Sequence, residues 1–208
     1  MRTYKNEKTN TLLLTFCVIA AFIMIFISDG FAAADTVRNE CLRLHVLAQS
    51  DNEEDQAVKL KVRDAILEET ENLFTGSTSV TEAVEKVSER KEEIKLIAEK
   101  VLQENGFAYG ARVFIEEEYF TTRQYDNVTL PAGNYTALKV ILGEGNGHNW
   151  WCVMFPPLCL PAVTEKNEDS VYTVFGESGG ALVTGKSGYK VKFRIVEIVE
   201  NIIEALKS

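Results

Sequence analysis

Residues 41–53, with the sequence CLRLHVLAQSDNE, are the starting point for predicting the fold. From Cys41 to Ala48 the side chains alternate, with Leu42, Leu44, Val46 and Ala48 on one face and Arg43, His45 and Leu47 on the other. A period of two is typical of a β-strand with one buried face. Ser50 to Glu53 have the spacing of a capping box, in which the serine accepts from the third helical amide and the glutamate reaches back. This stretch therefore predicts a strand followed closely by a helix.

Two helical stretches are predicted after this strand. The first extends to about Phe74, and the second runs from the capping residue Ser79 to about Gln103, where Asn105-Gly106 is a typical helix end. Their apolar positions have helical spacing and are expected to face a common core: Val58, Val62, Ala65, Ile66 and Leu73, then Val84, Val87, Ile94, Ile97, Val101 and Leu102. The charged residues from Glu89 to Lys95 form either a solvated face or a break between two helices.

Beyond Gly106 the sequence alternates again. Strands are predicted over 112–119, 135–142 and 149–154, with 127–134 as a connection and a weaker fourth strand over 171–175. From Phe193 the apolar spacing returns to that of a helix, with Ile195, Ile198, Val199, Ile202, Ile203 and Leu206 on one side. The predicted fold class is α+β: a strand and two or three amphipathic helices, then a mostly antiparallel sheet and a C-terminal helix.

Residues 1–34 are predicted to be a signal peptide or an N-terminal membrane anchor. Arg2, Lys5 and Lys8 precede an apolar run over 12–27, and Ala32-Ala33-Ala34 offers an A-x-A cleavage site before Asp35. As a helix the run would span about 24 Å, less than the roughly 30 Å hydrocarbon core, although flanking residues could extend it. Either alternative places residues 35–208 outside the cytoplasm, as a single α+β domain.

The composition is that of an ordinary globular protein, with 46% hydrophobic and 25% charged residues among 208. This balance excludes a disordered, collagen-like or multi-span membrane protein. The 22 basic and 31 acidic residues give a formal net charge of -9, whereas binding to a phosphate backbone needs clustered cations. Nucleic acid is therefore not an expected partner.

Export changes how the cysteines are interpreted. Cys152 and Cys159 flank a segment with two prolines and are expected to form a disulfide that closes a small loop. The alternative is two buried thiols. Cys41 is left unpaired, and Cys17 lies in the apolar run. Scattered cysteines and two distant histidines lack the spacing of a zinc site, so no metal or other cofactor is predicted.

Residues 176–180, GESGG, match the G-x-S-x-G pattern around hydrolase nucleophiles. Ser178 would need a histidine base, either His45 or His148, and a carboxylate to orient it. His45 lies in a predicted strand and His148 in a glycine-rich turn, and no clear strand–elbow–helix surrounds the serine. Glycines at this spacing more often serve a turn, so a secreted serine hydrolase is kept only as an alternative.

Two further groups of residues are candidates for contacting a partner or for shaping the fold. The first lies at the strand–helix junction and comprises Arg43, His45, Ser50, Asp51, Asp55, Gln56, Arg63 and Asp64. Asp51 and Asp55 are four residues apart on one helix face, where they would either bind a cation or join a network of caps and ion pairs.

The second group comprises Asn149, Trp150, Trp151, Pro156 and Pro157, together with Cys152 and Cys159. Adjacent tryptophans in a strand point to opposite faces of the sheet. Either one of the two rings is a rigid aromatic anchor for a partner, or both pack internally.

The two groups carry a resemblance to the stage II sporulation protein R family. The first block is LRLHVLAQSD at 42–51, continued by Asp55-Gln56, Lys59 and KVRD at 61–64. The second is Gly145 and Gly147, followed by NWWCV at 149–153 and FPPLC at 155–159. The resemblance spans most of residues 37–165 behind an export signal, and it does not extend distinctly to the later residues or to 176–180.

The resemblance implies an intercellular signalling protein of endospore-forming bacteria, and not an enzyme. Members are made in the forespore and exported into the space between its membrane and the mother-cell membrane. There they activate a membrane-embedded aspartic-type protease, which removes the pro-sequence of the mother-cell sigma factor. The expected partner is that protease, with additional membrane association through residues 12–27. A secreted hydrolase and a cation-binding structural protein are the alternatives.

Overall fold

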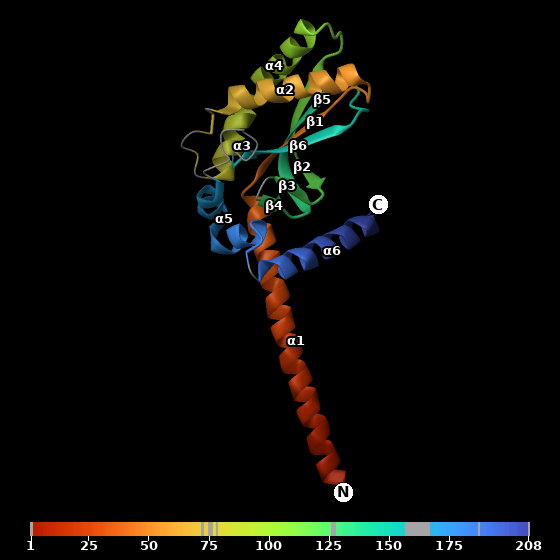
Figure 1. The fold of residues 1–208 in the computed structure, drawn as a ribbon, viewed down its shortest axis with the longest axis vertical. Coiled ribbons are helices and arrows are strands. Elements are labelled where there is room, and N and C mark those ends of the chain that lie inside the picture. Colours follow the sequence, from red (N-terminus) through yellow and green to blue (C-terminus); the bar gives the residue numbers. More distant parts are fainter. Residues whose placement is uncertain are drawn as a thin grey trace.

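The structure is a computed structural model that describes residues 2–71, 73–74, 77, 79–125, 128–156, 167–186 and 188–207. It begins with a long helix, α1 (Arg2–Asn39), whose N-terminal part extends away from the rest of the molecule (Figure 1). The chain then forms β1 (Leu42–Leu47), α2 (Glu53–Glu71), α3 (Val80–Glu89) and α4 (Lys91–Glu104). The fold is α+β, as predicted.

A four-stranded sheet forms the centre of the domain, in the order β2-β5-β1-β6. The other three strands are β2 (Ala111–Phe120), β5 (Gly133–Leu142) and β6 (Asn149–Phe155). β1 runs parallel to β5, and the remaining neighbours are antiparallel, so the sheet is mostly antiparallel as expected. A separate hairpin pairs β3 (Arg123–Tyr125) with β4 (Val128–Leu130). Only β4 lies within the segment 127–134 predicted as a connection, and β3 was not predicted.

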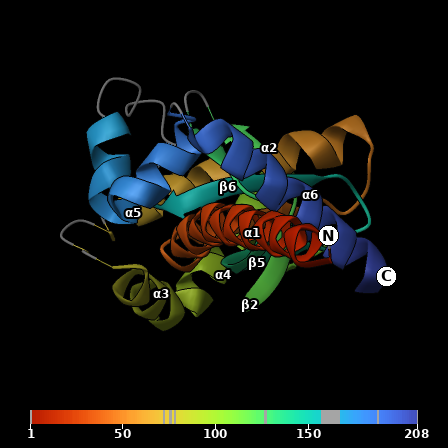
Figure 2. The ribbon, with the colours of Figure 1, turned by 90° about the horizontal axis from the view of Figure 1, so that it is seen from below.

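Each face of the sheet has its own core. Leu44 and Val46 of β1 pack with Leu138 and Val140 of β5 against α2, α3 and α4, and this face matches the alternation predicted for residues 41–48. On the opposite face Phe120, Tyr135 and Val153 pack against the end of α1, the β3–β4 hairpin and α5 (Asn167–Val183). Helices therefore cover both sides of the sheet (Figures 1 and 2).

The structure differs from the sequence prediction at the cap of α2 and at residues 171–175. The side chain that caps α2 is Asn52, whose Oδ1 accepts from the Asp55 amide at 2.7 Å, whereas Ser50 donates to the Asp55 carboxylate; the predicted Ser50 capping box is therefore wrong. Residues 171–175 are helical within α5, and not the weak strand predicted there. A short apolar run does not by itself separate strand from buried helix, and packing against α1 decides for helix. The predicted break in the second helical stretch falls at Arg90, between α3 and α4.

The GESGG segment has a packing role in α5. Gly176 adopts φ +65°, where it kinks the helix, and a Cβ at Gly179 would lie 3.3 Å from Cγ2 of Val37 in α1. Glycine therefore allows α5 to approach α1 closely.

α1 contains a segment, Leu13–Asn39, that is long and apolar enough to cross a membrane. The bond after Ala34, where cleavage is predicted, lies inside this helix. Ala33 and Ala34 are buried against Leu182 of α5 and Val196 of α6 (Tyr189–Lys207). Cleavage there stays a prediction, and it would remove residues that take part in this small core.

Candidate functional site at the β1–β6 seam

The two blocks singled out in the sequence lie side by side in the fold. β1 and β6 pair antiparallel, with His45 opposite Trp151 and Val46 opposite Trp150. The loop that leads into β6 also returns to the first block: the Gly147 amide donates to the Ala48 carbonyl at 2.9 Å. We call these paired segments, residues 42–51 and 147–155, the β1–β6 seam. They are separated by about a hundred residues in sequence and lie next to each other in the sheet.

Arg43 lies entirely inside the protein at this seam. Its guanidinium stacks 4.3 Å from the centroid of the Phe120 ring and 4.9 Å from that of Tyr135. It donates to the Cys152 carbonyl at 3.0 Å and to the Tyr125 hydroxyl at 2.7 Å. Within the described ranges no carboxylate pairs with it, so aromatic faces and two hydrogen bonds hold the cation. Because it is buried, Arg43 stabilises the seam from within.

His45 is the start of a hydrogen-bonded row across the same face. Its Nδ1 lies 2.6 Å from Glu118 of β2, and the other oxygen of Glu118 accepts from Lys139 of β5 at 3.0 Å. Burial alone would raise the pKa of Glu118, but the hydrogen bonds from His45 and Lys139 outweigh burial and lower the pKa. Next to this row, the His45 ring lies 5.7 Å from that of Trp151. The row links β1, β2 and β5.

The two tryptophans lie on opposite faces, as predicted for adjacent residues of a strand. Each is covered by an arginine: Arg63 of α2 lies 4.3 Å from the Trp150 ring centroid, and Arg123 of β3 lies 3.9 Å from that of Trp151. Trp150 remains 37% exposed at the outer strand of the sheet. An aromatic ring held under an arginine and still accessible matches the composition of protein-binding hot spots.

The carboxylates of the first block do not converge. Asp51 accepts from the backbone amide and Nδ1 of His148, both at 2.5 Å, and these hydrogen bonds lower its pKa. Asp55 instead accepts from Ser50 at 2.6 Å and from Tyr109 at 2.5 Å. Among the residues that the structure describes, no group of three or more histidine, cysteine or acidic side chains could hold a metal ion. Asp51 and Asp55 thus hold His148, Ser50 and Tyr109 beside the start of α2.

The remaining residues of the first block also brace the seam. Gln56 donates to the Ser50 carbonyl at 2.9 Å, and Lys59 donates to the His148 carbonyl at 2.9 Å. Arg63 pairs with the exposed carboxylate of Asp64 at 2.6 Å. The first block thus contributes mainly contacts that hold the second block in place.

The second block is described only as far as Pro156, which is buried after β6, as is Cys152 within it. Pro157 and Cys159 lie outside the described residues, so the Cys152–Cys159 disulfide stays a prediction. Cys41 is a free, buried thiol, and burial raises its pKa to about 12.

Ser178 lies in α5, where its Oγ accepts from Tyr189 at 3.4 Å. The two histidines pair with Glu118 and Asp51 instead, and in the described part of the chain neither is hydrogen-bonded to Ser178. The structure therefore brings together the two sequence blocks, and it does not assemble the nucleophile, base and carboxylate of a hydrolase.

Several residues of the site were not predicted from the sequence. Tyr125 and Arg123 come from the β3–β4 hairpin, and Glu118 and Lys139 come from neighbouring strands. The alternation of 112–119 and 135–142 does place Glu118 and Lys139 on one face of the sheet. Strand order, which brings them beside His45, is not encoded in either pattern.

The family model described as stage II sporulation protein R matches residues 38–165, which include the whole β1–β6 seam. The chain belongs to the stage II sporulation protein R family. A relative named "Stage II sporulation protein R" from Bacillus subtilis (strain 168) is 30% identical over 217 residues, covering 89% of this chain and 97% of the relative. No solved structure matches the chain. The match confirms the resemblance on which the sequence prediction rests and assigns the chain to sporulation.

Proposed function

We propose that this family member is an exported signalling protein of sporulation. It is made in the forespore and activates a membrane-embedded aspartic-type protease of the mother-cell membrane, which then processes the sigma-factor precursor. The observation that carries the proposal is the seam itself: the two blocks that identify the family meet in one place and expose an aromatic ring there.

The N-terminal helix supports export and attachment to a membrane. Three cations, Arg2, Lys5 and Lys8, precede the apolar part of α1, and such a charge bias retains the N-terminus in the cytoplasm. The domain then lies outside the forespore cytoplasm, in the space between the two membranes. We propose the anchored form, because the residues beside the A-x-A bond belong to the core formed with α5 and α6.

The seam supports activation by contact. Arg43 and the Asp51 and Asp55 networks use their polar groups within the chain, whereas Trp150 keeps an accessible ring at the outer strand. Catalysis is assigned to the protease, and Trp150 is proposed as the centre of the surface that it recognises.

The test is co-expression in a host without sporulation genes. The host carries the protease, the sigma-factor precursor and this protein, and processing is followed by gel mobility. We expect cutting only when this protein is exported, and we expect Ser178→Ala to cut as well as the unmodified chain. Trp150→Ala should weaken recognition by about 2 kcal/mol, roughly 30-fold in the concentration needed.

Leu96→Ala is the matched control, because Leu96 is an exposed apolar residue of α4 that lies outside both sequence blocks. If the exported, folded protein produces no cutting, the proposed function fails. If Trp150→Ala and Leu96→Ala behave alike, signalling does not depend on this tryptophan.

A further inference from the structure

The apolar stripe of α6 faces away from the domain. At about 100° per residue, Val191, Ile195, Ile198, Ile202 and Leu206 fall on one side of the helix. Four of these five side chains are more than half exposed, with Leu206 at 82%, and Ile195 is partly buried. The sequence predicts an amphipathic closing helix, and such a helix ordinarily turns its apolar side to the core. Here this apolar stripe faces outward, while Val196 on the other side of the helix packs into the small core.

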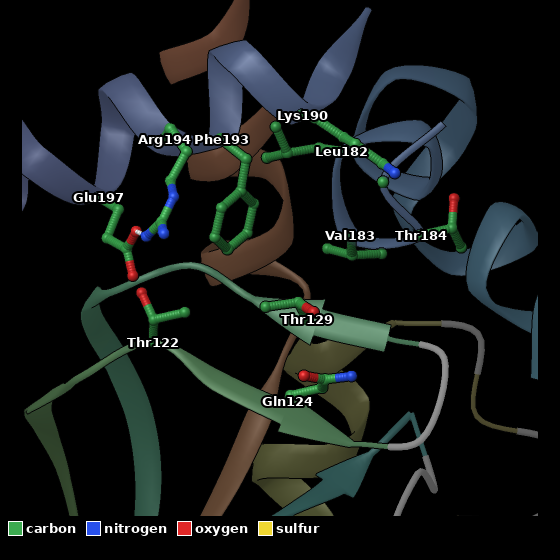
Figure 3. A pocket seen from close by; sticks show the side chains of 11 residues that line it. Thr122, Gln124, Thr129, Leu182, Val183, Thr184, Lys190, Phe193, Arg194 and Glu197 are labelled. Atoms are coloured by element: carbon green, nitrogen blue, oxygen red, sulfur yellow. Dashed lines mark hydrogen bonds and ion pairs between the residues drawn. The ribbon is translucent and has the colours of Figure 1, made fainter. Parts of the chain in front are cut away.

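The opposite side of α6 meets the protein through the small apolar core around Val196 and through polar groups. Figure 3 shows Phe193, Arg194 and Glu197 lining a cavity of about 670 Å³ beside Thr122 and Thr129 of the β3–β4 region. Further along, Glu200 pairs with the buried Arg38 of α1 at 3.1 Å. The acidic residues of α6, Glu197, Glu200 and Glu204, all fall on this inner side by helical spacing. The outer side therefore carries no negative charge from α6.

α6 is fastened to α1 where the exposed apolar part of α1 ends. Lys192 pairs with Asp29, and its Nζ lies 5.0 Å from the ring centroid of Phe26. Gly30 lets the two helices touch, since a Cβ there would be 3.0 Å from Cβ of Lys192. The side chains of α1 from Leu13 to Phe26 are mostly exposed and apolar, as a membrane span requires. Figure 1 shows α6 running sideways from this point, across the axis of α1.

From this arrangement we infer that the outer stripe of α6 lies on the membrane that α1 enters. The bilayer is the proposed occupant, because the exposed apolar surface of α1 ends at the junction at Asp29 and Gly30 and the exposed apolar stripe of α6 begins beside it. Of the cations near this junction, Lys192 pairs with Asp29 and Arg194 pairs with Glu197, so the apolar stripe and not a basic patch carries the inference. The domain is then attached at two places, by the span and by α6.

Two attachments set the orientation of the domain above the bilayer. One span alone permits rotation and tilt, whereas a second helix in the interface restricts both. The inference rests on the anchored form proposed above and not on the protease, so the two proposals can fail separately.

The experiment places an environment-sensitive fluorophore on exposed cysteines introduced one at a time into the full chain. Ile202→Cys and Ile198→Cys test the stripe, and Leu96→Cys on α4 is the control; each is made with Cys17→Ala, because Cys17 is exposed in α1. The chain is purified through an N-terminal tag, so that only uncleaved protein is measured. It is reconstituted into vesicles of phosphatidylcholine and phosphatidylglycerol at less than one chain per vesicle.

We expect a blue-shifted emission at positions 198 and 202 but not at 96. Nitroxide lipids labelled near the headgroup should quench these two positions more strongly than lipids labelled at the chain end, because the stripe enters only about 5–10 Å. Equal quenching at 202 and 96, with unchanged far-UV circular dichroism, would overturn the inference. So would a disulfide-linked dimer through Ile202→Cys in place of lipid quenching, since the stripe would then contact a second copy. If the exported protein is found only in the cleaved form and no tagged full-length chain can be recovered, the anchored form itself is refuted, whatever the processing assay shows.

Discussion

Arg43→Ala should lower the free energy of unfolding of this domain more than any substitution of the exposed Trp150. The substitution removes two hydrogen bonds from a charged donor, worth about 1.5–3 kcal/mol each, and stacking on aromatic rings worth about 0.5–2 kcal/mol. It also leaves a cavity between Phe120 and Tyr135. Against these losses stands the desolvation cost of a buried cation, several kcal/mol, which the variant no longer bears. We expect a net loss of about 3–5 kcal/mol in the free energy of unfolding.

The assay is urea unfolding of the full chain in detergent, followed by the fluorescence of Trp150 and Trp151 beside the seam. A loss of this size lowers the midpoint by roughly 1.5–2.5 M, with a slope of about 2 kcal/mol/M. Arg43→Met is the matched control, because it keeps most of the volume without the charge and should cost about 1–2 kcal/mol. The reasoning fails if Arg43→Ala costs less than about 1 kcal/mol. It also fails if that variant is stable yet inactive in the processing assay, which would assign Arg43 to partner contact.

Three further predictions follow from single contacts. Glu118→Gln should destabilise the domain above pH 4.5, the usual pKa of this carboxyl, because the lowered pKa of Glu118 stabilises the fold there. In unfolding curves, the difference in free energy of unfolding from the unmodified chain should shrink as the pH falls below 4.5. A difference that does not change with pH would contradict the role of the Glu118 pairs with His45 and Lys139. Cys41 should resist alkylation at neutral pH, because burial raises its pKa to about 12, and should react once urea unfolds the chain; mass spectrometry showing equal labelling in both states would count against burial. Gly147→Ala should lower the free energy of unfolding in the same urea assay by more than the about 1–3 kcal/mol typical of overpacking, because its Cβ would lie 2.2 Å from the Ser50 carbonyl oxygen. Gly106→Ala, with open space around it, should cost about 1 kcal/mol. Equal costs would show that the loop at Gly147 can move.

The burial of Arg43 shows why sequence patterns locate a site better than they describe it. Alternation from Cys41 to Ala48 places Arg43 on the face opposite Leu44, and an arginine on a strand is normally exposed there. Its burial depends on the rings of Phe120, Tyr135 and Tyr125, which come from three other strands. No pattern within residues 41–48 predicts those partners.

The segment 171–175 shows the same limit for secondary structure. Val171 and Phe175 are compatible with a buried strand, and also with one side of a helix. In the fold both pack beside Val37 of α1, and the glycine at 179 allows the close approach that keeps this segment helical. The capping of α2 by Asn52 differs from the predicted cap by only two residues, because neighbouring polar side chains compete for the same amides.

Local patterns in the sequence were enough to predict most elements of this protein and its family. These patterns are the alternation of β1, the helical spacing of 53–104, the apolar N-terminal run and the two family blocks. Each depends on neighbours within a few residues, so local backbone geometry is enough to predict it. The fold in three dimensions was needed to show that the blocks pair as β1 and β6 and that Arg43 is buried while Trp150 is partly exposed. It was also needed to show that an apolar stripe of α6 faces away from the domain. These outcomes depend on contacts between residues far apart in the chain, where many pairings satisfy the same local pattern and packing selects one.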